Sequence, residues 1–321
     1  MMLFEESTNK LLFWFLAVLS NRLTLCDHPS ISSGTPDEEI ISLRETSIRD
    51  APYIVALKIE LIDIYDKSLY YMLCAGTIIS RQWVITGAHC ILKEYDITKR
   101  VSIIMGVDGL LEIENMPQRN GDIPRADLWH CHPNFSTGMT FDPVTEHYTF
   151  WDSHDICLLR IDHNLQFGEY INRAVLPWDA LDQDITNKKL IEFRHGRLNE
   201  DGDNFEKLKS IYVKFLPGEE CTKMAPLYFM PEQDFCTEYF DKFQDEMSCS
   251  DPSWDHGGGI VYIDSITNCP VLRGILKGGH ECVFLTHSNL FLYKDWILET
   301  MERFHRPRDN ISYIYPPRNR E

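Results

Sequence analysis

Several histidine and aspartate side chains of this 321-residue chain could take part in acid–base or metal chemistry. In acid–base catalysis a carboxylate can orient an imidazole, which then accepts a proton from a nucleophile. The triplet His130-Cys131-His132 has the residue types of a metal site. Strand alternation would, however, place both histidines on the face opposite the cysteine, and we predict no metal there. A lone histidine or aspartate is usually structural, so the surrounding sequence decides.

The elements that must position these residues are short strands separated by Gly, Asp, Asn and Pro. The predicted strands cover residues 53–64, 73–80, 83–86, 101–105, 156–161, 211–215, 259–263 and 271–276. Many short strands favour a β barrel or sandwich over βαβ units. One helix is predicted over 290–301, where Tyr293, Trp296, Ile297 and Met301 form an apolar stripe that we expect to pack on the core. Residues 137–153, aromatic and polar without clear periodicity, and the polar loop 196–207 are predicted insertions.

Composition restricts the partners and the compartment. The chain has 49 acidic and 31 basic residues, a formal charge of −18. This argues against nucleic acid or heparin-like partners, whose anionic groups an acidic surface repels. The apolar run 11–19 is short for a membrane span and is typical of a signal-peptide core. We predict a signal peptide over 1–26, cleaved near Ser20 or after Cys26, and no membrane segment after cleavage; an uncleaved anchor is the alternative.

Ten cysteines and two glycosylation sequons, at Asn134 and Asn310, also indicate an extracellular, secreted chain. Residues 27–39 are polar and predict a flexible leader. Residues 303–321 form a basic tail, which is either disordered or a docking arm. The predicted folded domain lies between them, over residues 40–302.

Four segments of this domain resemble the chymotrypsin/trypsin-like serine proteases. Residues 74–90 (CAGTIIS and WVITGAHC) are similar to the family's Cys-Gly-Gly-Ser-Leu-Ile strand and Trp-Val-Leu-Thr-Ala-Ala-His-Cys segment. The other segments are 154–160, similar to Asp-Ile-Ala-Leu-Leu, 255–258, similar to Asp-Ser-Gly-Gly, and 274–275 with 293–297, similar to the last strand and helix. The resemblance implies an all-β fold of two six-stranded antiparallel β-barrels with a C-terminal helix. It makes His89 the general base and Asp155 the carboxylate that orients it.

The third catalytic residue of the family is a serine nucleophile, and this sequence does not match the family there. Alignment on the glycine pair 257–258 puts His256 at the serine position, whereas counting four residues from Cys249 puts Ser253 there. We favour His256, because the aspartate and glycines around it fit. Ser253 does not restore a site, because a proline would then replace the loop's buried aspartate. We therefore predict a protein that is not an enzyme.

Three further features that the family requires for proteolysis are missing from this sequence. Trp254 stands where a glycine amide would complete the oxyanion hole, and losing one such donor costs about 10²–10³ in rate. The activation site is lost, because Glu39 precedes Ile40 in place of Arg or Lys. The specificity pocket is rebuilt with Met247 in place of an aspartate and with Lys277-Gly278-Gly279 in place of Ser-Trp-Gly.

The resemblance also implies disulfides between Cys74 and Cys90, Cys221 and Cys236, and Cys249 and Cys282. Each is worth about 3 kcal/mol in the chain-entropy model. Cys131 and Cys157 fall on adjacent strands of the family fold and are a further candidate pair; the alternative is that Cys157 is a buried thiol. Cys26 and Cys269 remain unassigned.

The function implied is that of an insect-type serine protease homologue without a clip domain. Such a pseudoprotease would bind extracellular proteins, such as active proteases, inhibitors or their substrates, as a cofactor or decoy in haemolymph or reproductive fluid. The alternative is an active serine endopeptidase. A third hypothesis is zinc bound by His89 and His256, with Asp155 behind His89. Because a third ligand is missing, we predict neither a metal nor any other cofactor.

Overall fold

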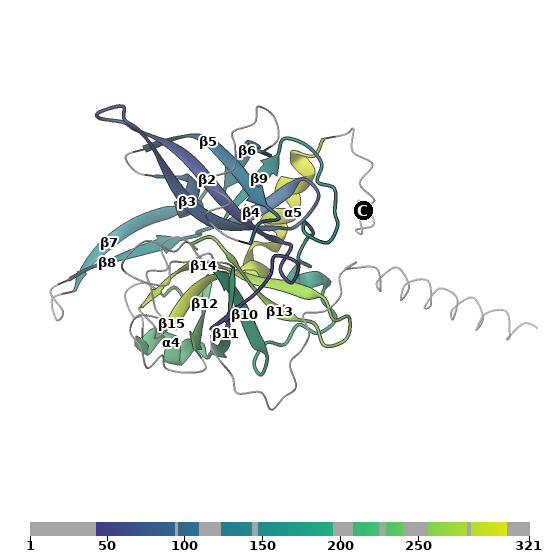
Figure 1. Ribbon diagram of the computed structural model, residues 1–321. Coiled ribbons are helices and arrows are strands. Elements are labelled where there is room, and N and C mark those ends of the chain that lie inside the picture. Colours follow the sequence, from purple (N-terminus) through teal and green to yellow (C-terminus); the bar gives the residue numbers. More distant parts are fainter. Residues whose placement is uncertain are drawn as a thin grey trace, which may run out of the picture.

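The strands of the chain form two antiparallel barrels, which lie one above the other in Figure 1. The computed structural model describes residues 43–93, 96–108, 123–142, 147–194, 208–224, 229–239, 256–280 and 284–306. The predicted signal peptide and leader, the predicted loop 196–207 and the tail beyond residue 306 lie outside these ranges. The predicted all-β, two-barrel fold with a C-terminal helix is confirmed.

Barrel 1 has the strand order β5-β2-β3-β4-β9-β6. Its strands are β2 (Ile54–Asp63), β3 (Leu69–Ile78), β4 (Trp83–Thr86), β5 (Asp96–Met105), β6 (Ala126–Cys131) and β9 (Cys157–Ile161). A bridge between Ser102 and Arg125 brings β5 towards β6 and nearly closes the barrel. Alternate residues of β2, such as Leu57 and Ile59, point inward and are fully buried.

Barrel 2 has the order β11-β10-β13-β14-β15-β12, and pairing of β11 with β12 closes it. Its strands are β10 (Lys189–Arg194), β11 (Lys209–Leu216), β12 (Asp234–Tyr239), β13 (Gly259–Ile263), β14 (Pro270–His280) and β15 (Phe284–Asn289). The short strand β1 (Leu43–Glu45) adds to the β11 edge. Helix α4 (Gly218–Met224) follows β11 and contributes the buried Cys221.

Apolar side chains between the barrels hold them together. Tyr53, Trp83 and Ile156 from barrel 1 belong to one buried cluster with Leu272 and Ile297. The C-terminal helix α5 (Lys294–Arg303) covers this cluster, after a 3₁₀ turn over Leu290–Tyr293. The predicted apolar stripe is confirmed, since Tyr293 and Ile297 are buried and Trp296 and Met301 pack on the cluster.

The region 137–153, for which no strand is predicted, forms a hairpin of β7 (Ser136–Asp142) and β8 (His147–Ser153). Figure 1 shows it projecting from the body of the molecule on one side. The residues after α5 pack on barrel 1: Arg160 donates to the Phe304 carbonyl at 2.7 Å, and Arg306 pairs with Asp127. None of the helices in the described ranges has the length and apolar character of a membrane span.

Candidate active site

His89 and Asp155 form a hydrogen-bonded pair at the junction of the two barrels. His89 lies on the short helix α2 (Ala88–Ile91), directly after β4, and Asp155 precedes β9, which pairs with β4. Asp155 is fully buried; its carboxylate accepts the His89 Nδ1–H at 2.6 Å and the His89 backbone N–H at 2.8 Å. Burial alone would raise the pKa of Asp155, but the charge and hydrogen bonds of His89 hold it below its usual value.

Glycine at position 87 leaves room for this pair. A Cβ added at Gly87 would lie 2.7 Å from His89 Nδ1 and 3.2 Å from Asp155 Oδ2. The Asp155 carbonyl accepts the Ser288 hydroxyl at 2.8 Å, which ties the loop before β9 to barrel 2. The carboxylate therefore has a fixed position behind the imidazole, as an oriented general base requires.

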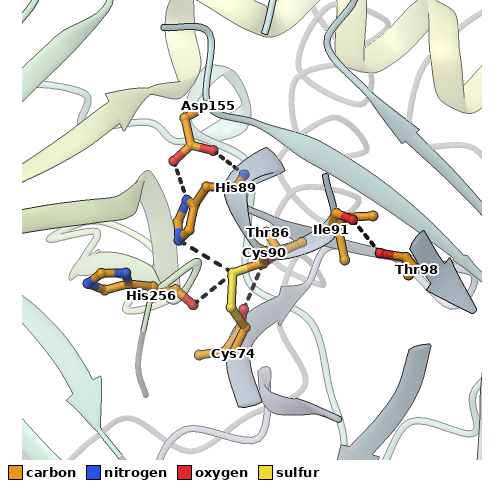
Figure 2. Close-up of a disulfide and its surroundings, with 9 residues drawn as sticks. Cys74, Thr86, His89, Cys90, Ile91, Thr98, Asp155 and His256 are labelled. Atoms are coloured by element: carbon orange, nitrogen blue, oxygen red, sulfur yellow. Dashed lines mark hydrogen bonds and ion pairs between the residues drawn. A yellow bond between two sulfur atoms is a disulfide. The ribbon is translucent and has the colours of Figure 1, made fainter. Parts of the chain in front are cut away.

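His256 lies beside the other edge of His89. The two imidazole centroids are 5.2 Å apart, and the ring planes meet at 79°. Figure 2 shows His89 between Asp155 on one side and His256 with the Cys74–Cys90 disulfide on the other. His89 Nε2 lies 3.5 Å from Cys90 Sγ, a disulfide sulfur that carries no proton. Among the described residues, no serine or threonine hydroxyl is hydrogen-bonded to this nitrogen.

The backbone around His256 is held against barrel 1. The Ala75 N–H donates to the His256 carbonyl at 2.9 Å. Gly257 has φ +82°, and a Cβ there would lie 2.2 Å from Thr86 Oγ1 and 2.8 Å from the Ala75 carbonyl. Only glycine combines this backbone conformation with so close an approach. The loop therefore holds His256 next to His89.

A buried ion pair lies next to the hydrogen-bonded pair of His89 and Asp155, which we call the dyad. Lys277 Nζ on β14 donates to Asp234 Oδ2 on β12 at 2.7 Å, and the two side chains are 5% and 1% exposed. Burial raises the pKa of Asp234 to about 6, against the opposing effect of Lys277. Lys277 also lowers the pKa of Asp155, so its cation acts on the dyad as well.

A second carboxylate, Asp152 at the end of β8, joins the dyad from the hairpin. A carboxylate oxygen of Asp152, one of Asp155 and a ring nitrogen of His89 lie within 4.8 Å of one another. Burial and the nearby Asp155 raise the pKa of Asp152, while His89, Thr137 and Lys277 oppose the rise. Lys93 lies close enough to be influenced by Asp152 and Asp155; burial lowers its pKa and these carboxylates oppose the change.

Comparison with known proteins agrees with this geometry. The sequence model of the family described as Trypsin matches residues 40–297. The chain belongs to the trypsin family. It is 24% identical over 246 residues to "Venom serine protease" of Polistes dominula, covering 76% of this chain and 77% of that protein. It is 23% identical over 252 residues to "Epidermal growth factor-binding protein type B" of Mus musculus, covering 74% and 84% of the two chains.

A third relative is longer. The chain is 24% identical over 269 residues to "Venom serine protease 34" of Apis mellifera, covering 81% of this chain and 58% of that protein. Together with the two barrels and the dyad, these relatives place the chain among the trypsin-like serine protease domains.

The structure brings together three of the predicted site residues, His89, Asp155 and His256. Gly278 and Gly279 lie on β14 opposite Thr286 and Leu285, with open space where a Gly278 side chain would be. Asn134 is exposed in the turn before β7. Six predicted residues lie outside the described ranges: Met247, Cys249, Ser253, Trp254, Cys282 and Asn310.

The structure contains the disulfides Cys74–Cys90, Cys131–Cys157 and Cys221–Cys236, pairs that the sequence analysis also expects. Cys131 and Cys157 are directly opposed on β6 and β9. In the described part of the chain, residues 130–132 do not belong to a cluster of three or more ligand-type side chains. The two histidines instead contact Trp296 of α5, with ring centroids 6.1 and 5.2 Å away, on the side opposite the disulfide.

Sequence reasoning did not identify Asp152 or the pairing of Lys277 with Asp234. A signal for the latter is present, because Lys277 follows directly on the predicted strand 271–276, which ends on Ile275 and Leu276. A lysine that continues a buried strand requires a partner of opposite charge. Which carboxylate this is depends on the closure of barrel 2, which sets β12 near β14 through β15.

Proposed function

We propose that this trypsin-family protein is a catalytically inactive, secreted homologue that acts by binding other extracellular proteins. The observation that carries the proposal is the T-shaped contact of His256 with His89. It supports the sequence alignment, which puts His256 where a nucleophilic hydroxyl would be required. The base and its orienting carboxylate are present, but the described atom nearest to His89 Nε2 in hydrogen-bond terms is the disulfide sulfur of Cys90, which has no proton to give. The sequence adds Trp254 at the oxyanion position and Glu39 before Ile40.

Retention of the scaffold supports a binding role. Two barrels, three described disulfides and a buried interface between the barrels maintain a rigid surface without requiring turnover. Disulfides persist in oxidising compartments, and the similar venom proteins are of a secreted kind, so we place the chain outside the cell. A glycan on the exposed Asn134 is part of this proposal.

Fluorophosphonate labelling tests the absence of activity, because only an activated serine reacts. We expect no adduct on the purified chain under conditions that label trypsin completely, and no cleavage of a broad peptide library. The variant Ser253→Ala serves as the matched control. An adduct on the natural chain that disappears in this variant would identify Ser253 as a working nucleophile and would refute inactivity.

The alternative is an active serine endopeptidase. The intact His89–Asp155 pair and the venom serine protease relatives favour it. It requires a nucleophile from outside the described residues, and Ser253 is the one that the sequence offers. The labelling experiment separates the two functions directly.

A further inference from the structure

The β7–β8 hairpin is separate from both barrels. Its strands pair only with each other in the described structure, from Ser136 opposite Ser153 to Asp142 opposite His147. Edge strands are usually protected by Lys or Pro, yet neither β7 nor β8 contains Lys, Arg or Pro. The hairpin therefore offers strand edges that another extended chain can pair with.

One face of the hairpin exposes apolar side chains. Met139 is 62% exposed and Phe141 is 49% exposed, and they lie two residues apart on β7. Alternate residues of a strand share a face, so these two side chains are on one side of the hairpin. The strand pairing places Phe150 opposite Met139 and Tyr148 opposite Phe141. Adjacent exposed apolar residues on a projecting element are typical of an interaction surface.

The same face leads to the inactive catalytic site. Thr137 precedes Met139 by two residues and is paired with Asp152. The carboxylate of Asp152 lies within 4.8 Å of the ligand atoms of His89 and Asp155. A segment lying along Met139 and Phe141 would thus reach Asp152 and the dyad at the base of the hairpin.

Charge indicates what kind of segment fits. Residues 136–153 include Asp142, Glu146 and Asp152 but no Lys or Arg, on a chain of formal charge −18. A second copy of this chain would bring like charges together, whereas a basic segment would be attracted.

We propose that the hairpin face of Met139, Phe141 and Asp152 binds an extended, Lys- or Arg-containing segment of a partner protein. The segment adds as a strand to the hairpin edge, with its apolar residues on Met139 and Phe141 and a cation beside Asp152. This inference rests on the proposed function, because it names the surface and the partner chemistry of the binding module.

The test uses the full secreted chain and fluorescent peptides of about ten residues. One peptide alternates lysine with valine, and the second alternates glutamate with valine. Fluorescence anisotropy should show at least about tenfold tighter binding of the lysine peptide. The double variant Met139→Ser/Phe141→Ser should weaken that binding at least about fivefold, and Asp152→Asn should weaken it and reduce its salt dependence.

The matched control is Ile266→Ser/Leu292→Ser, which removes two apolar side chains of similar exposure, 64% and 54%, from other parts of the surface. It should bind the lysine peptide as the natural chain does. Equal binding of the two peptides, or unchanged binding by the hairpin variant, would overturn the proposal. Self-association that the hairpin variant abolishes would also overturn it, because the occupant would then be a second copy.

Mass spectrometry of the peptide after the titration separates this inference from the proposed function. A cleaved peptide would contradict inactivity. The hairpin surface would then be tested by the binding affinities of the hairpin variants alone. An intact peptide that does not bind selectively would contradict the hairpin surface alone.

Discussion

The imidazole of His256 meets that of His89 at 79°, with 5.2 Å between the ring centroids, while Asp155 holds His89 from behind at 2.6 Å. The dyad is thus complete, and the ring of His256 lies beside it. We propose that His256 stands where active members of the trypsin family have the group that gives up a proton to the histidine.

We expect His256→Ser to leave the protein inactive, at least about 10³-fold below an ordinary family member. The new hydroxyl could be polarised by His89. The sequence alignment, however, predicts Trp254 at the oxyanion position, and Glu39–Ile40 lacks the Arg or Lys of a trypsin-like activation site. Loss of oxyanion stabilisation alone costs about 3–4 kcal/mol of transition-state binding. Turnover of a broad peptide library measures this, with His256→Ser/His89→Ala as background. Activity within tenfold of trypsin would show that the serine was the only missing part.

Zinc should bind the natural chain and His256→Ala equally. Two histidines backed by a carboxylate supply only part of a zinc site, and no third ligand atom joins His89 and His256 among the described residues. Isothermal titration with zinc alone measures the binding. Tighter binding by the natural chain than by the variant would restore the metal hypothesis.

Lys277→Met should destabilise the protein by about 3–5 kcal/mol at neutral pH, because Asp234 is then buried without its cation, either as an unpaired charge or with a proton that it must take up. The pKa of Asp234 is already raised to about 6, and loss of the cation raises it further above its unfolded value. The folded variant then keeps a proton on Asp234 that the unfolded chain has released. The loss of stability relative to the natural chain therefore grows as pH rises through 6 and shrinks towards pH 5.

Urea unfolding at pH 7.5 and 5.0 measures this deficit. The double variant Lys277→Met/Asp234→Asn removes both charges and should recover most of the loss at pH 7.5. A deficit that is the same at both pH values would mean that Lys277 acts through packing and not through its charge.

His132 should make the fold sensitive to acid. It stacks on His154 with centroids 4.6 Å apart, and burial, His154 and His130 lower its pKa to about 4. The unfolded chain takes up this proton near pH 6.5, whereas the folded chain does so only near 4. The contribution of neutral His132 to stability is therefore fully present above pH 6.5 and is lost as pH drops towards 4. The melting temperature of His132→Phe should fall less between pH 7.5 and 4.5 than that of the natural chain, and equal falls would contradict the prediction.

Local sequence determined the parts of the fold that bury one continuous apolar face. The predicted strands 83–86 and 259–263 coincide with β4 and β13, because all or nearly all of their residues are buried and apolar or small. The segments around His89, Asp155 and His256 likewise predicted a common site, because each lies within a long family-like context. Strands β12 and β15 were not predicted. They bury Asp234, Thr237, Thr286 and His287, and buried polar residues interrupt the hydrophobic pattern on which strand prediction depends.

Tertiary structure alone decided the rest of the site. Strand β7 exposes Met139, Thr140 and Phe141 in succession, so this stretch has no alternation of buried and exposed residues to give a period of two. The pairing of Lys277 with Asp234, 43 residues apart, exists only because β15 brings β14 and β12 together. Asp152 reaches His89 only because the hairpin returns to the barrel just before Asp155. Charged groups interact over a few ångströms of space, and barrel closure sets that distance independently of separation along the chain.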